Sequence, residues 1–132
     1  MRYLVPVGRV LYSGIFLMTA LGHFSAQYIG YAAQQGVPAA SLLVPLSGVI
    51  ATAGGLSIAL GYKAKVGAWL LVLFLVPVTF TMHNFWAVTD PMMRGLQLAM
   101  FMKNLSMLGA ALLIAHFGAG PLSLDARRAG VA

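Results

Sequence analysis

The chain has 132 residues, of which 61% are hydrophobic and 8% are charged, and its formal net charge is +6. This small number of charged residues cannot solvate the surface of a water-soluble globule. We therefore expect an integral membrane protein. The basic excess requires no nucleic-acid partner, because no nucleic-acid motif occurs and anionic lipid headgroups attract lysine and arginine.

Four segments are long and apolar enough to cross a bilayer, since each crossing needs about 20 residues for a hydrocarbon core of roughly 30 Å. They lie at about 4–24, 39–60, 66–86 and 92–117. The chain therefore predicts an all-α fold: a single four-helix transmembrane bundle over residues 1–132, with short loops. The first segment follows a basic residue, as a secretory signal does, but we expect it to be a retained span.

The segments between the spans carry turn and capping signals. Asp90 followed by Pro91 is typical of a helix start, because aspartate caps free N–H groups and proline suits the first helical position. Residues 61–65 form a short polar link, and residues 118–121 read as a helix stop. Residues 25–38 contain tyrosine and glutamine but no charge, which indicates a short helix at headgroup level. A lid over an outer cavity is the alternative.

The basic residues predict the orientation, because lysine and arginine collect on the cytoplasmic side. With a cytoplasmic N-terminus, the outer loops hold only Arg94. Both termini are therefore predicted to be cytoplasmic. The inner side then holds Arg2, Lys63, Lys65, Arg127 and Arg128.

Two further patterns concern packing. Small residues recur at every fourth position of the second span, which predicts a face where a neighbouring helix approaches closely. We expect Arg9 to be a snorkelling anchor near the inner surface, and His116 to meet the free carbonyls at the end of the fourth span. The small residues are Ser47, Ala51, Gly55 and Ala59.

Polar side chains within the last two spans predict a ligand site in the outer half of the bundle. On this topology the first and third spans both run outward, which brings His23 and His83 to the same surface. Lys103 lies near mid-membrane in the fourth span, where an ionisable residue is a functional candidate. The predicted ligand-binding residues are His23, His83, Asn84, Trp86, Gln97, Lys103 and Asn104.

These residue types fit a neutral or weakly anionic, oxygen-bearing headgroup, with a quinone as the preferred candidate. Lysine and histidine donate to carbonyl oxygens, asparagine donates or accepts, and the rings of Trp86 and Phe101 stack on a planar head. The alternative is structural. Lys103 then snorkels outward, and the amides of Gln97 and Asn104 only bridge helices.

The sequence holds no catalytic set and no metal site. It has no cysteine, which excludes disulfide exchange and cysteine-ligated iron–sulfur clusters. We expect no haem, because His23 and His83 lie high in the membrane, and no zinc, because only Asp90 offers a third ligand. The only acids, Asp90 and Asp125, lie in loops or caps, which disfavours a proton-coupled exporter.

The chain resembles the DoxX family of membrane proteins over essentially its whole length. The specific segments are Phe-x-Lys-Asn-Leu at 101–105 and Pro-Leu-Ser-Leu-Asp at 121–125. The resemblance implies a four-helix membrane bundle that acts as a small subunit near quinone-linked redox chemistry, and it supplies no catalytic residue. Further matching positions are Arg9, residues 22–24, Gly54, Gly55, residues 83–86, Asp90, Pro91, Gln97 and residues 118–120.

Two functional hypotheses follow for a multi-pass protein of the bacterial inner membrane. In the first, the chain is a redox-associated accessory subunit that binds a quinone or lipid headgroup in its outer half, with any electron donor supplied by a partner. In the second, it is a non-catalytic assembly subunit that packs against a larger membrane complex or forms a homo-oligomer. The sequence does not separate the two.

Overall fold

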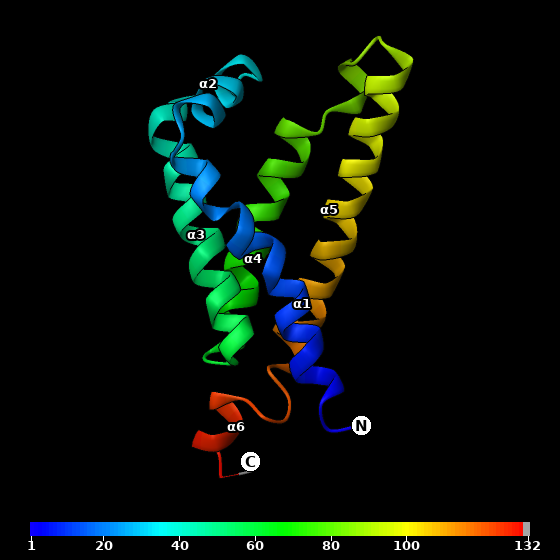
Figure 1. The fold of residues 1–132 in the computed structure, drawn as a ribbon. Coiled ribbons are helices and arrows are strands. Elements are labelled where there is room, and N and C mark those ends of the chain that lie inside the picture. The colour runs from blue at the N-terminus through cyan, green and yellow to red at the C-terminus, as the bar shows by residue number, and fades with distance from the viewer. Residues whose placement is uncertain (131–132) are drawn as a thin grey trace.

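The computed structural model describes residues 1–130, and every regular element among them is helical (Figure 1). Four helical segments are long and apolar enough to cross a membrane, which confirms the predicted four-helix fold. The long elements are α1 (Leu4–Thr19) continued by the 3-10 helix η1 (Ala20–Phe24), α3 (Ala40–Leu60), α4 (Ala64–Met82) and α5 (Pro91–Phe117).

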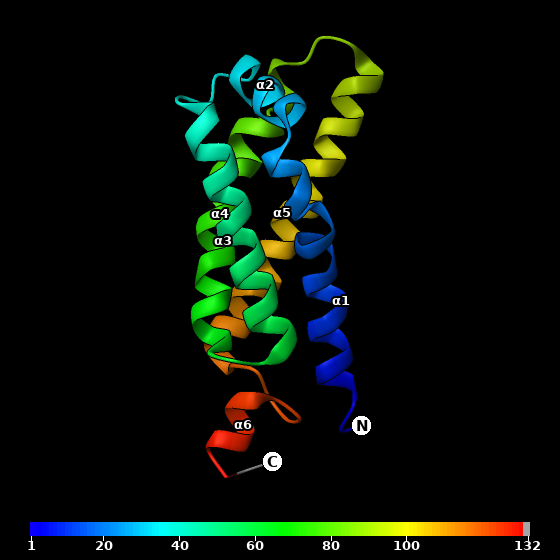
Figure 2. The same ribbon diagram turned by 60° about the vertical axis from the view of Figure 1, so that its left-hand side comes forward.

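Three short elements close the two ends of the bundle: α2 (Ala26–Gln34), the 3-10 helix η2 (Phe85–Ala87) and α6 (Leu124–Arg128). The predicted short helix after the first span is present as α2, whereas nothing in the sequence analysis anticipated α6. Both views place α2 at the same end of the bundle as the α4–α5 connection, and α6 at the opposite end, with the N-terminus (Figure 1, Figure 2). We name these the outer and inner ends, after the predicted topology.

The predicted caps of the last span are confirmed. The Asp90 carboxylate accepts a hydrogen bond from the backbone N–H of Met93 at 2.8 Å, and Pro91 is the first helical residue. At the far end, Gly118 has φ +81°, and α5 ends there. Glycine suits this position because side-chain-bearing residues rarely adopt positive φ.

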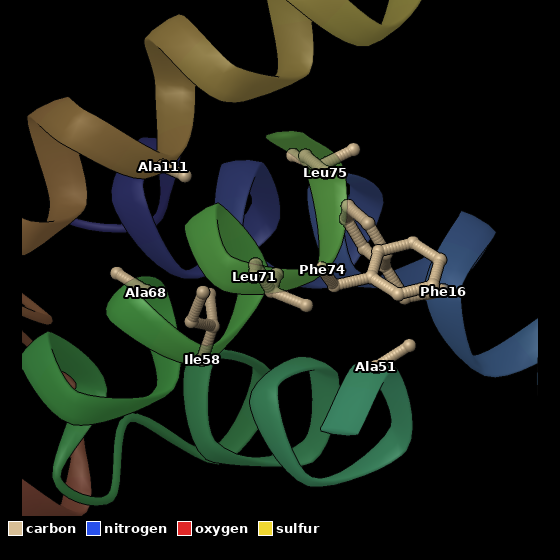
Figure 3. Packing of buried hydrophobic residues seen from close by; sticks show 8 residues of the cluster. All are labelled: Phe16, Ala51, Ile58, Ala68, Leu71, Phe74, Leu75 and Ala111. Carbon is tan, nitrogen blue, oxygen red and sulfur yellow. The ribbon is translucent and has the colours of Figure 1, made fainter. Parts of the chain in front are cut away.

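The hydrophobic core lies where α1, α3, α4 and α5 meet (Figure 3). Phe16 of α1 packs edge-on against Phe74 of α4, with ring centroids 6.1 Å apart. Small residues from three helices lie between the larger ones and let the helices approach. The cluster consists of Phe16, Ala51, Ile58, Ala68, Leu71, Phe74, Leu75 and Ala111.

Helices α3 and α4 approach closely at two glycines, Gly54 on α3 and Gly67 on α4. A Cβ added to Gly54 would lie 2.7 Å from a methyl carbon of Leu71 and 2.9 Å from the Gly67 carbonyl oxygen. The predicted small face of α3 is buried at Ala51 and at Gly55, whose added Cβ would meet Leu17 of α1 at 3.2 Å. The two neighbouring glycines of α3 therefore contact different helices: Gly54 contacts α4 and Gly55 contacts α1. The contact at Gly54 is the tighter of the two.

Arg9 corrects a prediction, because it is a buried bridge and not a snorkelling anchor. Its side chain is only 5% exposed. Its guanidinium donates to the carbonyl of Ala119 at 2.6 Å and to that of Leu122 at 2.8 Å. A planar guanidinium suits this role, since its several N–H donors diverge in a fixed geometry. Arg9 thus ties α1 to the segment that follows α5.

Asp125 makes a second tie at the inner end. Its carboxylate accepts hydrogen bonds from the backbone N–H groups of Lys63 at 2.8 Å and Ala64 at 3.0 Å. These N–H groups lie at the start of α4, which has no side-chain cap of its own. A residue from the C-terminal segment therefore caps a helix that begins some 60 residues earlier in the chain.

The predicted topology has a direct test, because the chain contains no native cysteine. Single cysteines at Gln34, in α2, and at Ala129, after α6, occupy opposite ends of the bundle. With both termini cytoplasmic, we expect a membrane-impermeant maleimide added to intact cells to label Q34C but not A129C. Labelling of A129C alone would show the inverted orientation, and permeabilised cells provide the control for reactivity.

Candidate functional site

A hydrogen bond between two predicted site residues joins α4 to α5 at the outer end. His83 directly follows α4, and its Nδ1 lies 2.9 Å from Oε1 of Gln97 on α5. Since an amide oxygen only accepts, the Nδ1–H of the histidine donates. In a neutral ring this leaves Nε2 as an acceptor, and the Gln97 amide nitrogen keeps its own donor capacity.

Four aromatic rings form a cluster on the same stretches of α4, η2 and α5. Phe101 of α5 is central, with ring centroids 5.4 Å from Phe80, 5.3 Å from Phe85 and 6.0 Å from Trp86. All three contacts are edge-to-face, the arrangement favoured by the quadrupole of aromatic rings. Trp86 remains 54% exposed, so part of its ring is available to a ligand or to lipid.

His23, another predicted site residue, has different partners. His23 is buried in η1, where its Nδ1 lies 3.1 Å from the Thr19 carbonyl and its ring packs against Phe74 and Tyr28. Its placement also depends on Gly48, because a Cβ there would lie 2.6 Å from the histidine Cβ. His23 is therefore a packing residue of the α1–α3–α4 contact.

Lys103 and Asn104 are adjacent in sequence but occupy different faces of α5. Asn104 is 4% exposed and is one of two buried residues of this helix, whereas Lys103 is exposed. Asn84 is half-buried, and its carbonyl accepts from the N–H of Ala87 within η2. The structure thus unites His83 and Gln97 beside Trp86, with Asn84 next in sequence to the histidine.

The inner end contains a cleft that the sequence analysis did not predict. Its volume is about 640 Å³, and it lies between the start of α4 and the segment after α5. Its lining includes the charged residues Lys63, Lys65 and Asp125 and the apolar side chain of Phe117. No local sequence motif predicts this cleft, because it forms only where the C-terminal segment folds back on α4.

Among residues 1–130, no group of three or more histidine, cysteine or carboxylate side chains is placed to hold a metal ion. The outer site offers a hydrogen-bond donor, an acceptor and an aromatic surface. Groups of these kinds are the ones that orient a polar ligand in small-molecule sites.

Comparison with protein families gives a match to the SURF4 family model over residues 2–129. The chain belongs to the SURF4 family. The DoxX assignment was therefore wrong: the segments that carried it, including residues 101–105 and 121–125, lie within the SURF4 match. The link to quinone-dependent redox complexes depended on that assignment and loses its support.

Three relatives in this comparison are named membrane or vesicle proteins. The chain is 32% identical to the inner membrane protein YqjF of Escherichia coli over 124 residues, covering 92% of this chain and 88% of YqjF. It is 30% identical to the inner membrane protein YphA of Escherichia coli, covering 75% and 70%. It is 34% identical over 80 residues to the ER-derived vesicles protein ERV29 of Saccharomyces cerevisiae, covering 61% of this chain but only 26% of the yeast protein. No solved structure matches the chain.

Proposed function

We propose that this multi-pass membrane protein resides in the bacterial inner membrane and binds a ring-bearing, oxygen-rich headgroup at its outer end. The location is supported by the names of YqjF and YphA, which both denote inner membrane proteins. The binding function is carried by one observation, the His83–Gln97 hydrogen bond beside the partly exposed ring of Trp86.

The donor and acceptor of this pair suit a quinone or its reduced form. The Gln97 amide nitrogen donates to a ring carbonyl, while the Nε2 of His83 accepts from a ring hydroxyl. The exposed part of the Trp86 ring offers a stacking surface for a planar head. The proposal concerns binding alone, and it assigns no electron transfer to this chain.

Trp86 also provides the measurement, because the chain has only two tryptophans. Replacing Trp69 by phenylalanine leaves Trp86 as the sole tryptophan reporter. A short-chain benzoquinone titrated into the detergent-solubilised protein is expected to quench Trp86 fluorescence with saturation. His83→Leu should weaken this binding about tenfold, corresponding to about 1.4 kcal/mol, the scale of one lost hydrogen bond.

His116→Leu is the matched control, because His116 is exposed in the last turn of α5, at the inner end. This variant should bind the benzoquinone as tightly as the parent does. Linear, unsaturated quenching that is identical in all three proteins would instead show only collisional contact in the micelle, and the headgroup proposal would fail.

A second candidate function is assembly with another membrane protein. The small number of buried residues in α5 favours this function. This helix has 27 residues, of which only Asn104 and Ala111 are buried, whereas seven residues each of α3 and α4 are buried. A span with so few buried residues has a large surface left for lipid or for a partner.

A further inference from the structure

The exposed side of α5 carries a charge near the middle of the membrane. Lys103 is the thirteenth of the 27 residues of α5, so its backbone lies about 18 Å along the helix from the start. Lys103 is exposed. Charged groups at this depth are rare, because hydrocarbon does not solvate them, and they usually pair within a protein interface.

The chain itself has no counter-ion to offer Lys103. It contains only two acidic residues. Asp90 caps the start of α5 through the Met93 N–H, and Asp125 caps α4 at the inner end. Both carboxylates are thus held at helix ends, far from mid-membrane.

The surface beside Lys103 has the shape of a helix-packing face. At 100° per residue, Gly95, Ala99, Ser106 and Gly109 fall on one side of α5, adjacent to the lysine, and all four are exposed. A Cβ added to Gly95 or Gly109 would meet nothing within 4 Å. Small residues at such spacing let a second helix approach closely in a membrane, where packing and polar contacts drive association.

We propose that this face of α5 docks a transmembrane helix of a different protein, and that a carboxylate near the middle of that helix pairs with Lys103. This proposal rests on the second candidate function, assembly with another membrane protein. It adds that the partner helix carries a carboxylate. A second copy of this chain does not provide a carboxylate near the middle of a membrane-spanning helix. Its spans contain no carboxylate, and a symmetric contact would bring two lysines together.

The test uses a defined probe, a leucine–alanine transmembrane peptide with one glutamate at its centre. The protein carries a donor dye at A129C, the peptide carries an acceptor dye, and energy transfer is measured in phosphatidylcholine vesicles at pH 8. We expect the glutamate peptide to associate at least tenfold more strongly than the same peptide with a central leucine. Lys103→Met should remove this difference, and Lys103→Glu should instead favour a peptide with a central lysine.

Lys65→Met is the matched control, because Lys65 lies in the first turn of α4 at the inner boundary and is exposed. This variant should bind the glutamate peptide as the parent does. A peptide with central glutamine separates charge pairing from hydrogen bonding, and it should bind more weakly than the glutamate peptide. Equal energy transfer for the glutamate and leucine peptides, or undiminished preference in Lys103→Met, would overturn the proposal.

Native mass spectrometry of gently extracted protein distinguishes failure of the pairing from failure of assembly. A complex heavier than the 13.9 kDa chain that contains a second protein supports assembly. If Lys103→Met leaves that complex intact at the same collision energy, the pairing is overturned while assembly stands. If only single chains with lipid are released, both are overturned.

Discussion

Gly54→Leu is expected to lower the free energy of unfolding by about 3 kcal/mol, the upper part of the range for overpacking a close contact. The added Cβ alone would lie 2.7 Å from Leu71 and 2.9 Å from the carbonyl oxygen of Gly67. Because one of these neighbours is backbone, rotation of a side chain cannot relieve the clash, and α3 must move away from α4. Thermal unfolding in detergent, followed by circular dichroism, measures the loss.

Gly109→Leu is the matched control for this variant. Gly109 also lies within a membrane span, but a Cβ at this position would meet nothing within 4 Å. We expect this substitution to leave the unfolding temperature unchanged or slightly raised, because leucine forms helices more readily than glycine. Equal destabilisation by the two substitutions would contradict the α3–α4 contact described above.

Arg9→Met is expected to lower the free energy of unfolding by a similar amount, about 3 kcal/mol. The substitution removes a charged donor from the carbonyls of Ala119 and Leu122 and leaves the buried Ala119 carbonyl unpaired, and such bonds are each worth about 1.5–3 kcal/mol. The segment after α5 should then detach, which trypsin cleavage at Arg127 and Arg128 would detect as a faster rate.

Two further substitutions test whether the loss of stability in Arg9→Met comes from the guanidinium hydrogen bonds. Arg9→Lys keeps the charge but loses the divergent donors, so it should recover only part of the stability. Arg2→Met removes an exposed charge that lies over the Tyr3 ring, and it should change neither the unfolding temperature nor the cleavage rate. If Arg9→Met behaves like Arg2→Met, the inner-end bridge does not hold the C-terminal segment.

The two ends of the bundle have different constructions. At the inner end, Arg9 and Asp125 bind backbone groups of distant segments, so these charges stabilise the fold. At the outer end, His83 and Gln97 bind each other beside a partly exposed tryptophan. Polar atoms with remaining hydrogen-bond capacity are therefore available at the outer end, which is why the headgroup proposal is placed there.

The sequence by itself determined the spans and their ends, because both depend on local properties. Continuous apolar stretches of sufficient length predict membrane helices, and Asp90, Pro91 and Gly118 act on the backbone within one turn of their own position. The sequence also placed His83 and Gln97 in the same outer half of the bundle, because the depth of each residue follows from its position in its helix. The DoxX resemblance, by contrast, was wrong, because the family model that matches residues 2–129 is that of the SURF4 family.

Only the tertiary structure decided the partners of Arg9 and the burial of Lys103 and Asn104. Arg9 is anchored by carbonyls more than 100 residues away, and no local pattern records such a distant partner. Lys103 and Asn104 have the same depth, and the way α5 packs against α4 determines which of them is buried. In a helix that is apolar on nearly every side, hydrophobic periodicity does not mark the packed face, so the assembled bundle alone distinguishes a core amide from an exposed charge.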